Sequence, residues 1–456
     1  MPFNSFEDYP MSWKPHLDRS ERSLYRALAR QLSDDIRSGV LRPGTKLPPQ
    51  RELADFLDVN VSTVSKAFKL CALKGLLCAT VGSGTFVSYD ALCSANLMRP
   101  QERTVIDMGP TVPEPSANAL LLDRMREMLA EPDAGRLFGY AAPGADEWQR
   151  DAAVELMERC GHRADRGRIL FAAGAQSALT AVLAAMFQKG EKLAVDAHTY
   201  PGVKTAASML GLQLVPVDSG PDGMDVDMLE ALCRSEKIRG LYLIPTCHNP
   251  TTANMPDSSR ARIAQIVRQS GCLLVEDGAY RMLHGGGRSV CDLVPGQGAY
   301  ILSLSKGIAP GLRMAYLSVP EQWRPAVADA LYSLNVATAP MMAELSARLI
   351  LSGEYERILE LHLRNTRERN QIVDRYFPGG VCLGSERDIF RWLRLPERYT
   401  GAEFEALALS RGVQVFGAER FAVGNAIPER AVRLSICAPD TPEALEEGLR
   451  ALAALL

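Results

Sequence analysis

The spacing of apolar positions divides the chain at about residue 105. Before this point, apolar residues recur every fourth position over 23–39, which predicts a helix that ends at Gly39. A second, short helix is predicted over 50–57 and a third from Ser62 as its N-cap, with a tight turn between them. Residues 79–87 alternate in hydrophobicity and contain two glycines, which predicts a two-stranded hairpin.

The third predicted helix has one apolar and one basic face. Val64 and Phe68 point inward, while Lys66 and Lys69 are left on the outer face. Two short helices joined by a tight turn, the second basic on its free face, predict a helix-turn-helix, with the hairpin as its wing. Residues 89–104 show no clean period and predict a linker that lets this head move relative to the rest.

After residue 105, apolar runs of strand length alternate with helical stretches, which indicates a buried, mainly parallel sheet. The predicted strands are 169–172, 192–196, 212–217, 239–245, 272–276, 300–304 and 314–319. The C-terminal part predicts a long helix, three strands and a last helix. The expected fold is therefore α/β, with a winged helix-turn-helix at 12–88, a linker at 89–104, a large domain at 105–353 and a smaller α+β domain at 354–456.

Composition and charge narrow the class of protein. The 456 residues, 47% apolar and 23% charged, are typical of a globular protein and exclude a disordered chain, a collagen-like fibre and a small disulfide scaffold. The apolar runs are too short to span a membrane, and the N-terminus lacks the apolar core of a signal peptide. We therefore expect a cytoplasmic protein. Residues 1–88 hold 12 Lys+Arg and 9 Asp+Glu, against 39 and 45 in the remainder, so a basic head on an acidic body hints at nucleic-acid binding.

Cysteine and histidine spacing gives no local metal motif. The ten cysteines form no C-x-x-C pair, and the six histidines form no H-E-x-x-H pair. We therefore expect free, mostly buried thiols, neither disulfides nor a metal site.

Polar residues follow the predicted strands, at the sheet edge where such folds bind ligands. Free amides at 174–177, which open a helix, suit a phosphate, and the hydroxyls of Ser303 and Ser305 and the charge of Arg313 would add to that site. Asp277, at a strand end, could pair with a protonated ring nitrogen.

The remaining strand-end residues suit an aromatic aldehyde. Asn249 and Tyr280 could donate to a phenolic oxygen, and Tyr200 offers a flat face for stacking. Lys306 follows a strand among small residues, where desolvation would lower the pKa of its amine and make it nucleophilic. A phosphate, a ring nitrogen, a phenolate and a lysine amine together describe pyridoxal 5′-phosphate (PLP).

The head resembles the winged-helix domain of the GntR family in LRPGTKLPPQRELADFLDVNVSTVSKAFKLCALKGLL and GSGTFV. The resemblance implies a regulator that binds double-stranded promoter DNA. The residues it places at the DNA are Arg51, Ser62, Thr63 and Lys66, with Gly82 and Gly84 in the wing. Arg51 and Lys66 would touch phosphates, and the start of the third helix would read base edges. Val61 stands where the family often has Arg, and a head used only for protein contact is the alternative.

The body, from about 105 to 456, resembles the class I/II aminotransferases of PLP fold type I. The matching pieces are SLSKGIAPGLRMAY, EDGAY, HNPTT and GAQSAL. The resemblance implies that Lys306 binds PLP as a Schiff base, that Asp277 pairs with the pyridine nitrogen, and that Asn249 and Tyr280 bind the phenolic oxygen. Lys306, Asp277 and Tyr280 would be the catalytic residues, and Tyr200 would stack on the ring.

The same resemblance implies the rest of the site. The phosphate cup would be formed by Ala175, Gln176, Ser303, Ser305 and Arg313. Tyr140, in FGYAAPGADEW, would reach the phosphate of a neighbouring subunit, which implies a homodimer. Arg433, in AVRLSIC, would hold a substrate α-carboxylate.

A GntR-like head on an aminotransferase-like body resembles the MocR subfamily of bacterial regulators. The first hypothesis is therefore a PLP-dependent transcription regulator that senses an amino acid, an amine or PLP itself through aldimine chemistry at Lys306. The second is a working aminotransferase with an auxiliary DNA-binding head, and the third a PLP sensor without an amine effector. The effector, the operator and the direction of regulation stay open.

Overall fold

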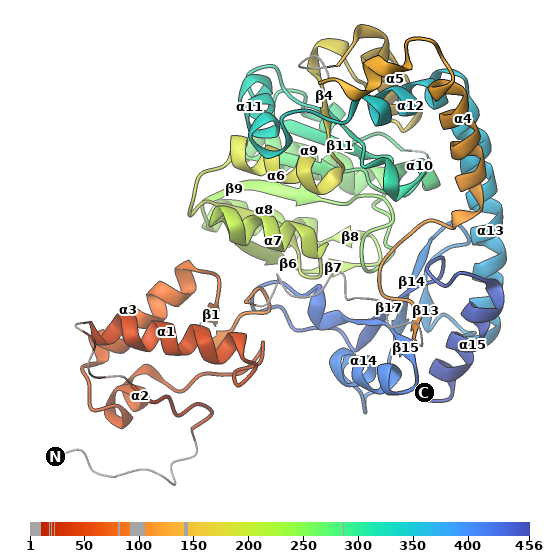
Figure 1. Cartoon of the computed structure of the whole chain (residues 1–456). Coiled ribbons are helices and arrows are strands. Elements are labelled where there is room, and N and C mark those ends of the chain that lie inside the picture. Colours follow the sequence, from red (N-terminus) through yellow and green to blue (C-terminus); the bar gives the residue numbers. More distant parts are fainter. Residues whose placement is uncertain are drawn as a thin grey trace.

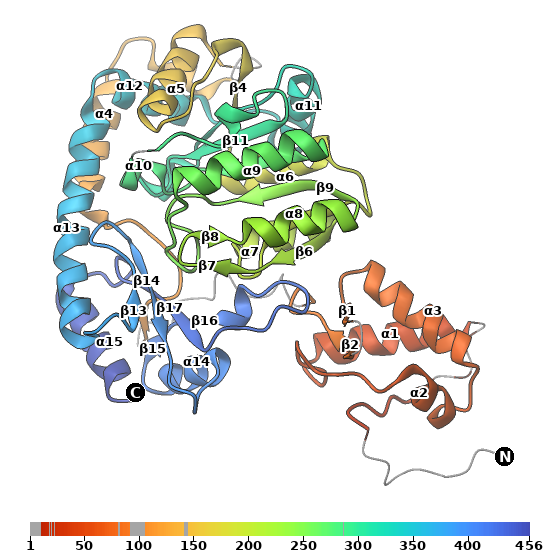
Figure 2. The same ribbon diagram turned by 180° about the vertical axis from the view of Figure 1, so that it is seen from behind.

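The computed structural model describes residues 11–17, 19, 21, 23–80, 83–91, 105–140, 145–285 and 287–456. A small N-terminal head lies to one side of a larger body (Figures 1 and 2). Gly82 of the expected wing and residues 92–104 of the expected linker lie outside the described residues.

The head has the predicted winged helix-turn-helix. Its helices are α1 (Leu24–Arg37), α2 (Gln50–Phe56) and α3 (Val61–Leu73), and its antiparallel hairpin pairs β1 (Leu77–Thr80) with β2 (Gly84–Val87). Leu32 of α1 and Val64 of α3 are fully buried because each lies on the apolar side of its helix. The expected N-cap at Ser62 is wrong: Asn60 precedes the helix, and Ser62 is already in its first turn.

The wing has a further backbone partner that the sequence did not indicate. Gly44 N donates to Val87 O at 2.8 Å, and Leu47 N donates to Thr85 O at 2.8 Å. Lys46 therefore forms a β-bridge with Phe86 and lies beside the wing.

The body is built on the predicted mainly parallel sheet. Its seven strands lie in the order β4 (Ile169–Ala172), β12 (Ala315–Ser318), β11 (Gly298–Ser303), β10 (Leu273–Asp277), β9 (Ile238–Leu243), β5 (Lys192–Asp196) and β6 (Gln213–Val217). Only β12 among them runs antiparallel to its neighbours. The carboxyl ends of the other strands consequently meet at one edge.

Helices cover both faces of this sheet (Figures 1 and 2). The side chains between the sheet and the helices form two apolar cores, one on each face. One face packs against α6 (Ala175–Met186) and α7 (Pro201–Leu210), and the other against α8 (Val226–Ser235) and α9 (Asp257–Ser270). Successive strand residues alternate between the cores, as Val275 and Leu274 do. The further helices of the body are α4 (Asn118–Leu129), α5 (Glu147–Arg159), α10 (Arg281–His284), α11 (Arg324–Asn335) and α12 (Pro340–Leu351).

The C-terminal part has a second sheet. Its order is β13 (Cys382–Leu383), β14 (Phe390–Arg394), β17 (Ala431–Ser435) and β16 (Phe416–Gly417). Its helices are α13 (Glu354–Tyr376), α14 (Gly401–Ser410) and α15 (Pro442–Ala453). Short strands complete the fold: β3 (Ile106–Asp107) pairs in parallel with β15 (Val413–Gln414), and β7 (Ser219–Gly220) pairs with β8 (Gly223–Met224).

The β3–β15 pair means that the start of the body lies with the C-terminal part, although the sequence assigned residue 105 onward to the large domain. The boundary at 353/354 stays a prediction. Within the described residues, no helix is both long and apolar enough to span a bilayer. The nine cysteines in the described part of the chain are free.

Candidate cofactor site and nucleic-acid interface

The turn after β4 places the start of a helix beside a guanidinium. Gly174 has φ 86, and a Cβ there would lie 2.4 Å from the Arg313 guanidinium, so only glycine fits. Arg313 itself has φ 47 and donates to Ala173 O at 3.4 Å. Ala175 begins α6 without a side-chain cap among the described residues, so the first amides of the helix are free for a phosphate.

The neighbouring polar groups are placed by short contacts. Ser305 N donates to the Ser303 hydroxyl at 3.2 Å, and both serines are buried. Gln176 Nε2 donates to Gly202 O at 2.9 Å, which ties the start of α6 to the start of α7. The Oε1 atom of Gln176 is buried and has no hydrogen-bond partner in the part of the chain described. Arg313 thus lies beside the start of α6, whereas Ser303 and Ser305 lie at the end of β11, and the joint role of these residues at a phosphate stays a prediction.

Asp277 ends β10 as a buried carboxylate. It accepts a hydrogen bond from the Tyr242 hydroxyl at 2.8 Å and one from Ala279 N at 2.9 Å. Burial raises the pKa of Asp277, while the Lys306 ammonium lowers it. Tyr242, inside β9, was missed because a tyrosine in a buried strand has no motif around it.

Lys306 is half-buried, and its Nζ donates to the carbonyl of Thr111. Burial lowers the pKa of Lys306 to about 8, helped by the charges of Arg433 and Arg313. An amine with this pKa is partly neutral near pH 7, as a nucleophile requires. Thr111 was also missed, because it comes from the strand-poor segment after β3.

Arg433 lies on β17 and is 3% exposed. It donates to Asn249 Oδ1 at 2.7 Å and to Gly109 O at 2.6 Å, and its guanidinium carbon lies 4.8 Å from the centre of the Phe421 ring. Its Nε has no hydrogen-bond partner, and no carboxylate pairs with it, among the described residues. Burial lowers the pKa of Arg433 to about 10. A buried cation held only by neutral groups suits an incoming carboxylate.

The two predicted tyrosines, Tyr200 and Tyr280, both lie close enough to Asp277 for its charge to raise the pKa of their hydroxyls, and their roles toward a ring stay predictions. Tyr280 is 3% exposed, its ring centre is 5.3 Å from that of Phe390, and burial raises the pKa of its hydroxyl. Burial, together with the negative charge of Asp277, raises the pKa of Tyr200 to about 12. Tyr140, in contrast, is 91% exposed and does not join the other residues within one chain. Its expected role toward a neighbouring subunit stays a prediction.

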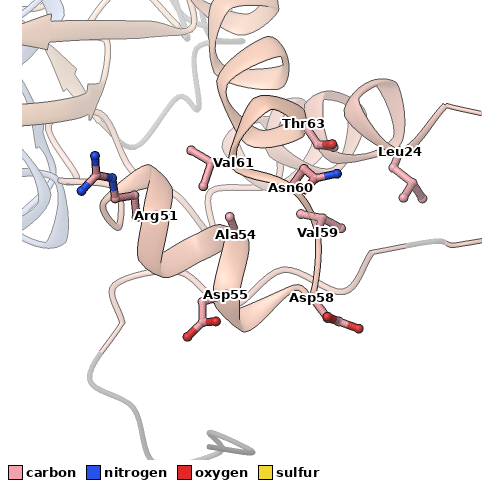
Figure 3. A pocket seen from close by; sticks show the side chains of 9 residues that line it. All are labelled: Leu24, Arg51, Ala54, Asp55, Asp58, Val59, Asn60, Val61 and Thr63. Carbon is pink, nitrogen blue, oxygen red and sulfur yellow. The ribbon is translucent and has the colours of Figure 1, made fainter. Parts of the chain in front are cut away.

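The predicted DNA contacts lie on the surface of the head. Arg51, Ser62, Lys66 and Gly84 are exposed, and Thr63 is half-buried. Arg51 and Thr63 line a shallow hollow at the helix-turn-helix, with Arg51 pointing away from the carboxylates of Asp55 and Asp58 (Figure 3). Lys46 is a candidate that the sequence analysis missed: its side chain covers Gly84, 3.0 Å from where a Cβ would lie.

The end of the head is fastened to the body by a buried lysine. Tyr89 N donates to Gly424 O at 3.1 Å, and Gly424 N donates to Asp90 Oδ2 at 2.9 Å. The Lys204 side chain, 1% exposed, forms an ion pair with Asp90 Oδ1 at 3.5 Å and donates to Tyr89 O at 3.3 Å. Lys204 also donates to the carbonyls of Arg420 and Ala422.

Comparisons with known proteins divide the chain in the same way. The family model of aminotransferase class I and II matches residues 105–452, and that of bacterial regulatory proteins, gntR family, matches residues 24–87. The chain is 52% identical to an uncharacterized HTH-type transcriptional regulator, YdeF, of Bacillus subtilis, over 100% of this chain and 99% of that protein. It is 31% identical to 2-aminoadipate transaminase of Thermus thermophilus, over 62% of this chain and 74% of the transaminase.

A solved structure gives the same result for the fold. The crystal structure of LysN, the alpha-aminoadipate aminotransferase of Thermus thermophilus, complexed with N-(5′-phosphopyridoxyl)-L-leucine, matches with a TM-score of 0.70 and 26% identity. The match covers 80% of this chain and 95% of that one.

The residues present fit PLP. The Gly174 turn accommodates a guanidinium and leaves free amides for a phosphate, as described above. The buried carboxylate of Asp277 can pair with a ring nitrogen, and Asn249, whose oxygen is held by Arg433, has its NH₂ group left to donate. Lys306 supplies the amine at the same edge of the sheet.

Uptake of PLP by the cofactor-free protein is predicted to accelerate as the pH rises through about 8, the pKa to which burial lowers Lys306. The neutral amine is the reactive form, so the rate should be low below this pH and level off above it. The visible absorbance of the protein-bound cofactor measures the rate in a series of buffers. Lys306→Ala should give no band, and exposed Lys189→Ala should behave as the parent does. A midpoint near the ordinary lysine value of about 10.4 would contradict the burial argument.

Proposed function

The chain belongs to the class I and II aminotransferase family and carries a GntR-family head, and from this premise we propose that it is a PLP-dependent transcription regulator. It binds promoter DNA through the head and responds to an amino compound bound in the body. The full-length similarity to a protein named as an HTH-type transcriptional regulator supports this proposal. The observation that carries it is the contact between the cofactor site and the head through residues 420–424.

Residues 420–424, the bridging segment, touch the site on one side and the head on the other. The Phe421 ring lies against Arg433, and Phe421 O accepts a hydrogen bond from Thr199 N at 2.9 Å, immediately before Tyr200. Gly424, at the other end, forms hydrogen bonds with Tyr89 and Asp90, which directly follow the last residue of the head. A ligand that changes the surroundings of Arg433 therefore acts on the segment that fastens the head.

The ligand class follows from Arg433. Its buried guanidinium lacks a carboxylate partner among the described residues, so a ligand carboxylate would gain a charge-assisted, bidentate contact. PLP, when bound, supplies an aldehyde that reacts reversibly with amino groups. Lys306 would provide the resident amine and exchange protons, while Asp277 would keep the ring nitrogen charged. We accordingly propose an amino acid or ω-amino acid as the effector.

A working aminotransferase is the second candidate. Proton transfer in transamination needs an amine that can take up and release a proton and a buried carboxylate. Lys306, with its pKa lowered to about 8, and Asp277 supply these two groups. The similarity to 2-aminoadipate transaminase supports this candidate for the body alone. A homodimer, with Tyr140 directed to the neighbouring subunit and two heads on a repeated DNA site, is part of the proposal in either case.

The two candidates are separated by titrating the PLP-loaded full chain with amino acids and amines while recording absorbance and DNA affinity in parallel. The probe DNA is the set of fragments that the full chain selects from a random pool. A regulator predicts an absorbance shift that persists and a change in DNA affinity at the same ligand concentration. An enzyme predicts a shift that decays and recovers with a keto acid. A ligand that shifts the absorbance and leaves DNA affinity unchanged would contradict the regulator.

Removing either proposed phosphate contact should weaken DNA binding without changing which sequence is preferred. Log affinity falls linearly with log salt concentration. In each of the variants Arg51→Ala and Lys66→Ala, the magnitude of this slope should decrease by about one, because one phosphate contact is lost. Arg234→Ala, an exposed charge on the body, is the matched control and should change neither quantity. If the slope is unchanged in both variants, neither Arg51 nor Lys66 contacts a DNA phosphate, and the prediction is wrong.

Lys204→Met should separate ligand binding from the response of the head. The substitution removes the buried ammonium that joins Asp90 to the bridging segment, while the cofactor residues and α3 stay intact. The variant should retain PLP and should bind DNA without ligand as the parent does. The change in DNA affinity on adding ligand, typically ~5–150-fold in coupled proteins, should be largely lost. Lys192→Met, which removes a half-exposed ion pair with Glu236, should leave the response intact. If ligand changes the DNA affinity of Lys204→Met as much as that of the parent, the contact of Lys204 with Asp90 does not connect the cofactor site to the head.

A further inference from the structure

Three metal-ligating side chains converge beside the cofactor site and take no part in it. They are Cys247, which follows β9, His284, which ends α10, and Asp388, which precedes β14, and one ligand atom of each lies within 4.8 Å of the others. Cys247 is fully buried, and the side chains of His284 and Asp388 are 10% and 1% exposed. Water therefore has little access to the cluster.

The two polar atoms of this cluster are not satisfied by hydrogen bonds. His284 Nε2 and Asp388 Oδ1 form an ion-pair contact at 2.8 Å, but both atoms are buried and neither has a hydrogen-bond partner among the described residues. A buried nitrogen and a buried carboxylate oxygen in this condition are costly unless something binds them. A cation placed among these atoms and the Cys247 sulfur would bind all three.

The ligands are held in position by neighbouring contacts. The other carboxylate oxygen of Asp388 accepts a hydrogen bond from Ser385 N, and Cys247 N donates to Asn254 Oδ1 at 2.9 Å. Arg387 Nε donates to Leu283 O at 2.8 Å, which joins the residues next to Asp388 and His284. Such supporting contacts orient the ligands of natural metal sites.

We propose that Cys247, His284 and Asp388 bind one Zn²⁺ ion, with water in the fourth position. A thiolate, an imidazole and a carboxylate are the donors that zinc takes in proteins, and a sulfur ligand disfavours Mg²⁺ and Ca²⁺. The sequence offers no reason to expect a metal, because its cysteines and histidines form no closely spaced motif. These three ligands are far apart in the chain and meet only in the fold.

The ion would lock together elements that carry the cofactor site. Cys247 lies two residues before Asn249, His284 ends the helix that begins after Tyr280, and Asp388 precedes the strand whose Phe390 ring touches Tyr280. The proposed site thus joins the large sheet to the C-terminal sheet. Its role is structural, and it holds the C-terminal part against the cofactor pocket.

The test uses the full-length protein with PLP bound, stripped of metal by a chelator and titrated with Co²⁺ as a spectroscopic substitute for Zn²⁺. The parent should take up one equivalent, with a thiolate-to-cobalt absorbance band that excess Zn²⁺ abolishes. Cys247→Ser should lose the band, and Asp388→Asn should lose most of the uptake. Cys160→Ser, at a buried thiol outside the cluster, is the matched control and should retain both.

A second measurement needs no substitution. Adding Zn²⁺ to the stripped parent should raise its melting temperature, and the rise should be absent in Asp388→Asn. If the parent takes up no more Co²⁺ than Cys247→Ser, or if Cys247→Ser keeps the band, the proposal is overturned. The three side chains would then form a buried polar cluster without a metal.

Discussion

The body must compensate the buried positive charge of Arg433, and the arrangement of several of its parts depends on this constraint. A cation removed from water without a carboxylate partner is unfavourable by several kcal/mol, and it persists only where many groups compensate it. Here a carbonyl from the start of the body, Gly109, and an amide oxygen from the loop after β9, Asn249, converge on it, with aromatic rings of the C-terminal part close by. The cation therefore joins three distant parts of the chain.

A second buried cation, Lys204, extends this arrangement to the head. It occupies the first turns of α7, the helix that begins directly after Tyr200, and it binds carbonyls of the bridging segment together with Asp90. The two cations thus contact the same segment. In physical terms, the cofactor site and the head share a structural element, which is what a coupling free energy between two sites requires.

Much of this could be predicted from local pattern. The strands at 169–172 and 192–196 have the predicted bounds because turn residues enclose short apolar runs, and Asp277 and Lys306 were identifiable because they follow such strands. Tyr242, Thr111, Lys204 and the β3–β15 pair were not predicted, since each depends on a partner far away in the sequence. The cluster of Cys247, His284 and Asp388 was not predicted for the same reason, nor was the backbone partner of the wing.

Amide hydrogen exchange on the PLP-loaded full chain can show whether the cofactor site and the head are coupled through the bridging segment. The amides of Thr199, Val423, Tyr89 and Gly424 all take part in hydrogen bonds at this segment. If they are coupled, an amino acid that binds the site will change the exchange rates of these amides and of amides in α3 of the head. Changes confined to the cofactor pocket, with 420–424 and 88–91 unaffected, would contradict this coupling.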